Sequence, residues 1–386
     1  MLCRVEAAAA CVWGVVGLLA ALDAREARRF PLKSPSAEPP ASAKASVSII
    51  APMRNEAGHV RGWLASARAQ GATVCEIIVS DDDSEDATAE IANAIALDDP
   101  RVRVLRGSPP SGWVGKTSAA DRGARIATGD WLLFSDADMR MAPGTVAAVL
   151  AACARYGADA CSLTATLECG TPIEQAVMPA MAAIIMSGHP LVLIHDPLSP
   201  VALVWGGFVL VRRDAYFAIG GHAAVRGEIA EDRALAQRLK AFGFRVRLID
   251  GHCFVRVRMY RGFADMWQGW RKNVYEGTKR NPALATLFIA AVIAMLVVPQ
   301  PALVMLGCAA AHRKLRGTER KLAWWCAVNA AGNLVARALR DRAIGARTLT
   351  ALAAPIAGAF IASVMTASAW RGVTGRGQTW KGRVIR

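Results

Sequence analysis

Residues Gly129 to Met141 read GDWLLFSDADMRM. The apolar run WLLF has the length of a buried strand and stops at Ser135, and two carboxylates, Asp136 and Asp138, follow one residue apart. Side chains two positions apart on an extended segment point to the same face, so these charges repel unless a cation lies between them. Mg²⁺ and Mn²⁺ bind through one or two carboxylates plus substrate phosphates. The stretch therefore suggests a divalent cation holding a diphosphate; the alternative is a solvated loop.

Strands and helices alternate along the chain on both sides of this stretch. The expected strands are 47–53 (VSIIAPM), 76–80 (EIIVS), 102–107 (VRVLRG) and 131–135 (WLLFS), and the expected helices are 57–69, 86–99 and 117–128. This alternation predicts an α/β fold with a mostly parallel, doubly wound sheet. Ligands of such sheets bind beyond the carboxyl ends of the strands, which is where the acidic clusters lie.

Another acidic cluster follows the strand EIIVS. Asp81 and Asp82 could accept hydrogen bonds from a nucleobase or from ribose hydroxyls. The alternative is helix capping, with Asp83 or Ser84 capping a helix that starts near Asp86.

Three further charged groups complete the set of candidates. Glu56 closes the first strand and could accept from ribose or head the next helix. Lys116 ends SGWVGK, where glycines let a ligand approach and the lysine can pair with phosphate, although a surface turn would explain it equally. Glu231 and Asp232 open a helix, where acids suit the dipole, or they supply a general base that takes a proton from an attacking hydroxyl.

Composition places part of the chain at a membrane. Of 386 residues, 54% are hydrophobic, and the mean hydropathy is +0.28. The segment from Phe254 onward carries 21 Lys and Arg against 4 Asp and Glu, whereas the first 253 residues carry 25 against 27. Basic loops beside apolar runs favour an anionic membrane surface over nucleic acid, for which no binding motif is present. Nine scattered cysteines without a CxxC pair argue for a reduced compartment.

Apolar stretches suggest several membrane segments. Residues 7–22 are expected to form an N-terminal anchor rather than a cleaved signal peptide, because the positive flank follows the segment. The C-terminal stretches are 283–311, interrupted by Pro299 and Pro301, then 322–339 and 348–370. The loops 312–321 and 337–347 and the tail are all basic, so the crossing number (three or four) and the side of the tail stay open; a cytosolic tail is favoured, and 322–339 could instead lie flat at the interface.

Several motifs together carry a family resemblance. They are, in order, APxxNE at 51–56, two aspartates at 81–82, DxD at 136–138, GGxxLxRRxAY at 206–216 and EDxxLxxRL at 231–239. In this order they resemble the family 2 glycosyltransferases with a GT-A fold. GWVGK at 112–116, GGH at 220–222, MYRGFADMWQGWRKN at 259–273 and WKGR at 380–383 resemble the membrane-bound subgroup associated with hopanoid and carotenoid glycosylation.

The resemblance implies a role for each matching position. Pro52, Glu56 and Asp81 or Asp82 would hold the nucleoside. Asp136 and Asp138 would hold Mg²⁺ or Mn²⁺ and the donor diphosphate, with Asp138 preferred as the direct ligand. Asp232, with Glu231 beside it, would be the catalytic base, and Lys116 would face the diphosphate. Gln268 and Arg271 are similar to the QxxRW motif of processive synthases, but Lys272 replaces its tryptophan.

The expected protein is an inverting transferase that moves a sugar from a nucleotide-diphosphate sugar, UDP being favoured, to a membrane lipid. It would be a multi-pass protein of the cytoplasmic membrane with its catalytic domain in the cytosol. A processive polysaccharide synthase and a catalytically degenerate membrane scaffold are the alternatives. The expected segments are an anchor (1–24), a linker (25–46), the GT-A domain (47–262), an interfacial segment (263–282), transmembrane helices (283–370) and a basic tail (371–386).

Overall fold

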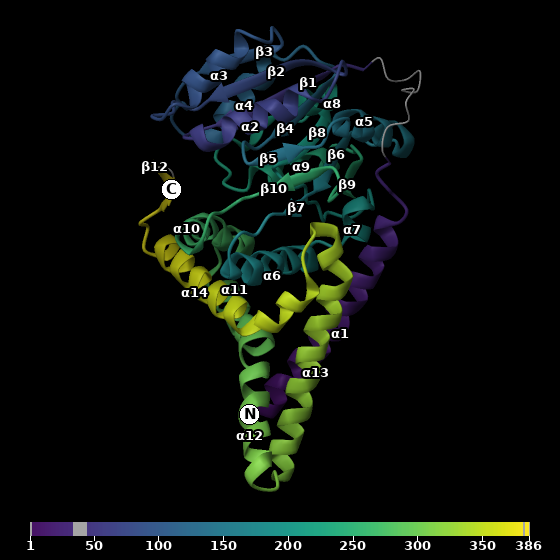
Figure 1. Cartoon of the computed structure of the whole chain (residues 1–386), viewed down its shortest axis with the longest axis vertical. Coiled ribbons are helices and arrows are strands. Elements are labelled where there is room, and N and C mark those ends of the chain that lie inside the picture. Colours follow the sequence, from purple (N-terminus) through teal and green to yellow (C-terminus); the bar gives the residue numbers. More distant parts are fainter. Residues whose placement is uncertain (1, 34–44, 381–382, 386) are drawn as a thin grey trace. The chain divides into compact units, whose positions relative to one another are not determined.

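The computed structural model describes residues 2–33, 45–380 and 383–385. The chain divides into two units (Figure 1). The sheet unit comprises residues 26–168 and 191–258, and the helical unit comprises residues 1–25, 169–190 and 259–386. The segment 34–44 of the expected linker, and Lys381, Gly382 and Arg386 of the expected tail, lie outside the described residues.

The sheet unit is built around a seven-stranded sheet in the order β3-β2-β1-β4-β8-β6-β9. Its strands are β1 (Val47–Met53), β2 (Val74–Asp81), β3 (Val102–Arg106), β4 (Trp131–Ser135), β6 (Ala160–Thr164), β8 (Phe208–Arg212) and β9 (Val246–Asp250). Its helices are α2 (Ala57–Arg68), α3 (Thr88–Ala96), α4 (Gly115–Ile126), α5 (Thr145–Tyr156), α7 (Leu191–His195), α8 (Arg213–Ala218), η1 (His222–Val225) and α9 (Glu231–Ala241). The predicted α/β fold is confirmed.

Strand direction decides which loops meet at one edge. Strands β1, β2, β3 and β4 run parallel, so their carboxyl ends lie together, and Met53 pairs with Asp81, which pairs with Arg106. Strand β8 runs antiparallel to β4 and β6, with Phe208 opposite Ser135. The amino end of β8 therefore lies beside the carboxyl end of β4, a reversal that the strand-helix alternation alone does not predict.

A three-stranded sheet fixes the segment after the DxD motif. Strand β5 (Met139–Met141) begins directly after Asp138, pairs antiparallel with β10 (Val255–Val257), and β10 pairs in parallel with β7 (Thr166–Leu167). Val257 lies opposite Met139. Asp138 lies in the short turn between β4 and β5, and because β5 is hydrogen-bonded into a sheet, the end of this turn is fixed.

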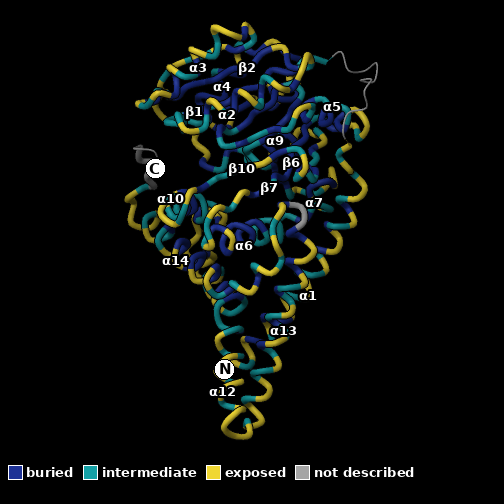
Figure 2. The backbone as a smooth tube through the Cα atoms, in the orientation of Figure 1, coloured by how far each residue is buried: buried dark blue, intermediate teal, exposed yellow. Residues whose placement is uncertain are grey.

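The core of the sheet unit lies on both faces of the main sheet, where the strands are buried (Figure 2). On one face, Ile50, Leu132 and Phe134 pack in one cluster with side chains of α4, α8 and α9. On the other face, Trp63 of α2 is fully buried and donates from Nε1 to Ser135 Oγ at 3.1 Å. Helices on both faces of the sheet match the doubly wound expectation.

The helical unit contains the long apolar segments. Its elements are α1 (Leu2–Ala27, whose last two residues belong to the sheet unit), α6 (Pro172–Gly188), α10 (Phe263–Asn273), η2 (Val274–Thr278), α11 (Pro282–Val292), η3 (Ile293–Val297), α12 (Pro299–His312), α13 (Gly317–Arg340), η4 (Asp341–Ile344), η5 (Thr348–Ala353), α14 (Ala354–Val373), β11 (Gln378–Trp380) and β12 (Arg383–Ile385). Among the described residues, two helical segments are long and apolar enough to cross a membrane, Leu2–Ala27 and Thr348–Val373. The segments Phe263–Thr278 and Pro282–Val297, bent by 115°, would make a third if they count as one span.

Prolines shape the apolar run that begins at residue 283. The π-helical stretch η3 lies directly before Pro299, and Val298 N donates to Ile293 O at 3.0 Å. Proline lacks a backbone N–H, and its ring crowds the carbonyl four residues earlier, so the preceding turn widens.

Buried polar contacts join α1 to α13 within the helical unit. Asn329 Nδ2 donates to the Glu6 backbone oxygen at 3.1 Å and to Glu6 Oε2 at 2.5 Å. Arg340 Nη2 lies 3.2 Å from Asp23 Oδ2, and both side chains are buried. Polar groups buried among apolar helices need such partners, which explains why polar residues are tolerated in these helices.

Candidate functional site

Two glycines bring the amino end of β8 into contact with the DxD motif and with α9. Gly207 O accepts from Asp136 N at 3.2 Å, and Gly206 N donates to Asp232 Oδ2 at 3.1 Å. A Cβ at Gly206 would lie 2.9 Å from Asp232 Oδ2, and one at Gly207 would lie 2.9 Å from the sulfur of Met139. Only glycine lets the backbone approach this closely, so this pair connects the two parts of the site.

Lys116 connects the same two parts by charge. Its Nζ lies 2.8 Å from Asp136 Oδ1, 3.1 Å from Asp136 Oδ2 and 2.8 Å from Glu231 Oε1. Burial opposes its charge, but Asp136 and Glu231 outweigh that effect and raise the pKa of Lys116 well above its ordinary value. Lys116 is the second residue of α4, whereas the surface turn expected for this stretch is limited to the exposed Ser111 and Gly112. We call Lys116, Asp136, Asp138, Glu231 and Asp232 the second acidic edge.

Asp138 is the carboxylate of this edge that fits a cation. Its Oδ1 is buried and has no hydrogen-bond partner among the described residues. Burial, followed by repulsion from Asp136 and Glu56, raises its pKa to about 7. A buried carboxylate oxygen without a donor is costly, and a divalent cation would remove that cost.

The residues around Asp138 do not form a complete protein cage for a metal. Within the described part of the chain, no three His, Cys, Asp or Glu side chains are grouped so as to hold an ion. A site of one or two carboxylates completed by phosphate and water is the usual arrangement for Mg²⁺ and Mn²⁺, so the residues present fit such an ion.

Asp232 is held by backbone donors at the start of α9. Its Oδ1 accepts from Arg233 N at 2.7 Å, and its Oδ2 accepts from Gly206 N. Burial, and then the neighbouring charge of Glu231, raise the pKa of Asp232 to about 6. A carboxylate whose pKa is raised toward neutrality is a stronger base than an ordinary one, which suits proton abstraction.

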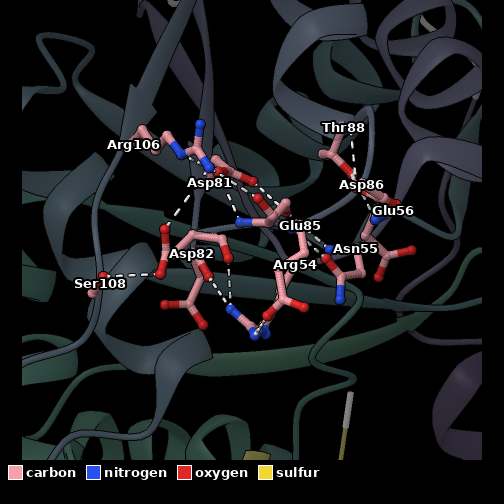
Figure 3. Close-up of polar contacts among 12 residues, drawn as sticks. Arg54, Asn55, Glu56, Asp81, Asp82, Glu85, Asp86, Thr88, Arg106 and Ser108 are labelled. Atoms are coloured by element: carbon pink, nitrogen blue, oxygen red, sulfur yellow. Dashed lines mark hydrogen bonds and ion pairs between the residues drawn. The ribbon is translucent and has the colours of Figure 1, made fainter. Parts of the chain in front are cut away.

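At the carboxyl end of β2, protein donors already surround the carboxylate of Asp81 (Figure 3). Asp81 is fully buried; its Oδ1 accepts a short hydrogen bond from Ser84 Oγ and its Oδ2 accepts from Ser84 N at 3.1 Å. Arg106 Nε lies 3.6 Å from Asp81 Oδ2. Asp82 is buried, and its backbone N donates to Met53 O at 2.7 Å. Both carboxylates predicted at this edge are therefore on well-anchored backbone.

Arg54 and Asn55 tie the end of β1 to this turn (Figure 3). Arg54 donates to the backbone oxygens of Asp82 at 2.8 Å and Asp83 at 2.7 Å, and Nη2 lies 3.0 Å from Glu85 Oε1. Asn55 Oδ1 accepts from Glu85 N at 2.9 Å. We call residues 81–86, with Arg54 and Asn55, the first acidic edge.

The capping interpretation of this edge needs correction. Helix α3 begins at Thr88, and neither Asp83 nor Ser84 caps it. Asp86 does that work instead, because its Oδ1 accepts from Thr88 N at 3.0 Å while its Oδ2 accepts from Ala57 N at 3.0 Å. Ser84 is engaged by Asp81, and Asp83 lies in the left-handed region at φ 58°.

Two predicted residues at the end of β1 lie beside the first acidic edge. Glu56 directly precedes α2, and its side chain does not cap that helix. Its backbone N donates to Thr88 Oγ1 at 2.8 Å, and its Oε2 lies 3.1 Å from His59 Nδ1. Pro52 lies within β1 opposite Ser80.

Gln268 and Arg271 belong to α10 of the helical unit and not to the sheet unit. The backbone oxygen of Arg271 accepts from Ser368 Oγ at 2.6 Å. Trp270, between them, donates from Nε1 to the sulfur of Met178 at 3.4 Å. These contacts fix α10 within its own unit, and the predicted nucleotide-sugar role of Gln268 and Arg271 stays a prediction.

Sequence reasoning did not assign a role to Gly206, Arg54 or Arg106. The signal for Gly206 was present as the GG that opens GGxxLxRRxAY, but its purpose depends on the reversal of β8. Arg54 lies within APxxNE at a variable position, and Arg106 ends a strand without a motif. Their contacts cross between segments far apart in the chain, so local patterns do not indicate them.

The sequence also matches a family model. The model for glycosyl transferase family 2 matches residues 48–217, which contain both acidic strand ends and the glycine pair. The chain contains a family 2 glycosyltransferase domain. The resemblance drawn from the motifs is thereby confirmed.

Relatives of this glycosyltransferase domain include two staphylococcal proteins described as 4,4'-diaponeurosporenoate glycosyltransferases. The protein from Staphylococcus haemolyticus is 28% identical over 252 residues, covering 63% of this chain and 65% of the relative. The protein from Staphylococcus aureus (strain USA300) is 24% identical over 234 residues, covering 60% and 61%. The alignments thus span less than two thirds of these relatives.

A solved structure of similar fold is a mannosyltransferase from Pyrobaculum calidifontis in complex with GDP-Man and Mn²⁺. It superimposes with a TM-score of 0.51 at 17% identity, covering 97% of this chain and all of that one. At this identity the likeness concerns the fold, and it agrees with the GT-A architecture predicted from the sequence.

Proposed function

We propose that the chain is an inverting glycosyltransferase that moves a sugar from a nucleotide-diphosphate sugar, a UDP-sugar being favoured, to a hydroxyl or carboxyl group of a membrane lipid. The observation that carries the proposal is the second acidic edge. There, Asp138 has a buried oxygen without a described partner, and Asp232 has a raised pKa. Their two segments are joined by Gly206 and Gly207 and by Lys116, which bonds Asp136 and Glu231.

Asp232 acts as the base. An acceptor oxygen attacks the anomeric carbon, the bond from that carbon to the diphosphate breaks, and any proton on the attacking oxygen passes to Asp232. The backbone N–H groups of Gly206 and Arg233 hold the carboxylate in place for this transfer. Proton transfer by a positioned carboxylate accelerates such steps by about 10²–10⁴-fold.

Asp136 and Asp138 hold the divalent cation, with Asp138 as its direct ligand. When bound, the cation offsets the charge that develops on the leaving diphosphate. Lys116 places a second positive charge at the same edge. Its ion pair with Glu231 holds it next to Asp232, the catalytic base. Mn²⁺ in the Pyrobaculum structure supports the choice of a divalent ion.

The first acidic edge receives the nucleoside in this proposal. Asp82 and Glu56 are assigned to binding the nucleobase and the ribose, with Pro52 beside them. Asp81 is assigned mainly to shaping the turn, because Ser84 already bonds both of its carboxylate oxygens. Gln268 and Arg271 are assigned to the donor diphosphate on the basis of the motif resemblance alone.

The acceptor is assigned to the lipid phase. Two apolar helical segments long enough to span a membrane flank the sheet unit in sequence, and the staphylococcal relatives are named for a carotenoid acid. A carotenoid-type lipid is therefore the first acceptor class to test. Nucleotide sugars are made in the cytosol, so we place the catalytic domain on the cytosolic side of the cytoplasmic membrane.

The test is sugar transfer by the purified, detergent-solubilised full chain. The protein is incubated with Mn²⁺, single UDP- and GDP-sugars, and a membrane lipid extract that contains carotenoids, and the lipids are analysed by mass spectrometry. We expect a new glycolipid with one donor and none with Asp232→Asn. A polymer of growing length would instead support a processive synthase, and no product with any donor would contradict the proposal.

A further inference from the structure

Lys116 occupies the oxygens that a cation at the DxD motif would need. Both carboxylate oxygens of Asp136 lie within 3.1 Å of its ammonium group. Asp138, two residues on, has a buried oxygen that no described residue bonds. One aspartate of the pair is therefore already neutralised by the protein itself, while the other is not.

The charge at this edge explains why a built-in cation is present. Asp136, Asp138, Glu231 and Asp232 bring four carboxylates together, and Lys116 is the cation that bonds two of them. Carboxylates this close repel strongly when partly removed from water. Lys116 lowers that repulsion as long as the site contains no other cation.

A divalent ion that uses both aspartates must take at least one oxygen of Asp136 from Lys116. The ammonium group would then keep Glu231 as its partner, 2.8 Å away, and have donors left for a phosphate oxygen. In the proposed reaction, the diphosphate of the nucleotide sugar supplies that phosphate oxygen. When the ion binds alone, Lys116 loses its contact with Asp136 and gains nothing in return. When the ion and the nucleotide sugar bind together, the new contact of Lys116 with the diphosphate offsets that loss.

We propose that Lys116 is an internal counter-ion that competes with the divalent cation for Asp136, so that the cation binds tightly only together with the nucleotide sugar. This inference rests on the proposed function and adds that tight binding of the cation depends on binding of the nucleotide sugar. Lys116 moves from Asp136 to the diphosphate as the site fills, and Glu231 anchors it in both states. Glu231 is then a positioning residue for Lys116, and Asp232 is the base.

The competition is tested by binding of Mn²⁺ alone, without nucleotide, to the purified full chain by calorimetry and by electron paramagnetic resonance. Lys116→Met removes the competitor, and we expect Mn²⁺ affinity to rise by about tenfold or more, as expected for loss of a close charge pair. Lys116→Arg keeps the charge and should bind Mn²⁺ as weakly as the wild type. Lys116→Gln serves if the Met variant does not fold, as judged by circular dichroism.

Arg233→Met is the matched control, because Arg233 lies beside Asp232 on the first turn of α9 but the described ion pair of Asp136 is with Lys116. It should change Mn²⁺ affinity by less than about twofold, since Arg233 is half-buried, makes no described ion pair with Asp136, and acts only through a partly screened field. Equal gains in Arg233→Met and Lys116→Met would show a general field effect and overturn the proposal. Unchanged or weaker Mn²⁺ binding by Lys116→Met would overturn it as well.

Asp138→Asn separates this inference from the function on which it rests. If Asp138→Asn abolishes Mn²⁺ binding but Lys116→Met does not strengthen it, the metal site stands and the competition is wrong. If Asp138→Asn binds Mn²⁺ as the wild type does, the metal assignment itself fails, and the competition fails with it.

Discussion

The two acidic edges look alike in sequence and differ in physical state. Both place aspartates at the carboxyl end of a buried strand, where DDDS begins with the last residue of β2 and SDAD with the last residue of β4. At the first edge, Ser84 donates to both carboxylate oxygens of Asp81, and Arg106 lies 3.6 Å from one of them. At the second edge, Asp138 Oδ1 lacks a donor among the described residues, and burial raises the pKa of three carboxylates: Asp136, Asp138 (to about 7) and Asp232 (to about 6).

This difference indicates how such clusters can be interpreted. An acidic cluster whose donors come from the protein is a structural turn that presents a ligand surface. An acidic cluster whose donors are missing is one that a ligand or a proton completes. The donors around an individual carboxylate, and not the number of carboxylates, therefore separate Asp81 from Asp138.

The largest effect is expected from Asp232→Asn. An amide keeps the shape and can still accept from Gly206 N, but it does not take a proton, so turnover should fall by about 10³-fold. UDP binding measured by calorimetry should stay within about twofold of the wild type, because Asp232 is not assigned to the nucleotide. Lost binding with the same loss of turnover would make Asp232 structural.

The pH dependence should follow the same residue. The base works when deprotonated, and the pKa of Asp232 is about 6, so kcat/KM should fall about tenfold for each pH unit below that value and level off above it. The measurement is a kcat/KM profile from pH 4.5 to pH 8. A profile that is flat down to about pH 4.5 would mean that the base has an ordinary carboxylate pKa.

Stability separates the two edges directly. Asp81→Ala leaves Ser84 without its buried acceptor, so the free energy of unfolding should drop by about 2 kcal/mol. Asp138→Asn removes a buried charge that has an unbonded oxygen, so the metal-free protein should be as stable as the wild type or more so. Urea unfolding of both variants in the presence of a chelator checks this, and equal losses would mean that the two edges do not differ.

The smallest effect is expected from Asp86→Ala at the first edge. Asp86 accepts from the N–H groups of Thr88 and Ala57, one at the start of α3 and one at the start of α2. Loss of such capping costs about 1 kcal/mol, with kcat nearly unchanged. Thermal unfolding combined with kinetics tests it; Glu85→Ala, which removes an exposed ion pair, is the control and should cost less.

The sequence predicted most of the elements that hold the site. Strands β1 and β4 begin and end at the predicted residues, since short apolar runs bounded by polar residues define them well. Helix α3 is shorter than predicted, because the contacts of Asp86 delay its start until Thr88. Local pattern was sufficient wherever the determinant was the alternation of buried and exposed residues.

The local sequence pattern was not sufficient where the structure of the site depends on the direction of a strand or on pairing between strands of the sheet. The reversal of β8 puts Gly206 against Asp232, and no local signal gives the direction of a strand. The position of Lys116 between Asp136 and Glu231 joins three segments of the chain, so its charge was predicted to matter but its partners were not. Such contacts depend on the assembled sheet.

The central claim is that the second acidic edge is completed by a cation and a donor diphosphate. Titration calorimetry of UDP into the full chain, with Mn²⁺ and with a chelator, tests it most directly in the wild type and in Asp138→Asn. We predict that Mn²⁺ tightens UDP binding at least about tenfold in the wild type and leaves Asp138→Asn unchanged. Equal tightening by Mn²⁺ in both proteins would contradict the claim.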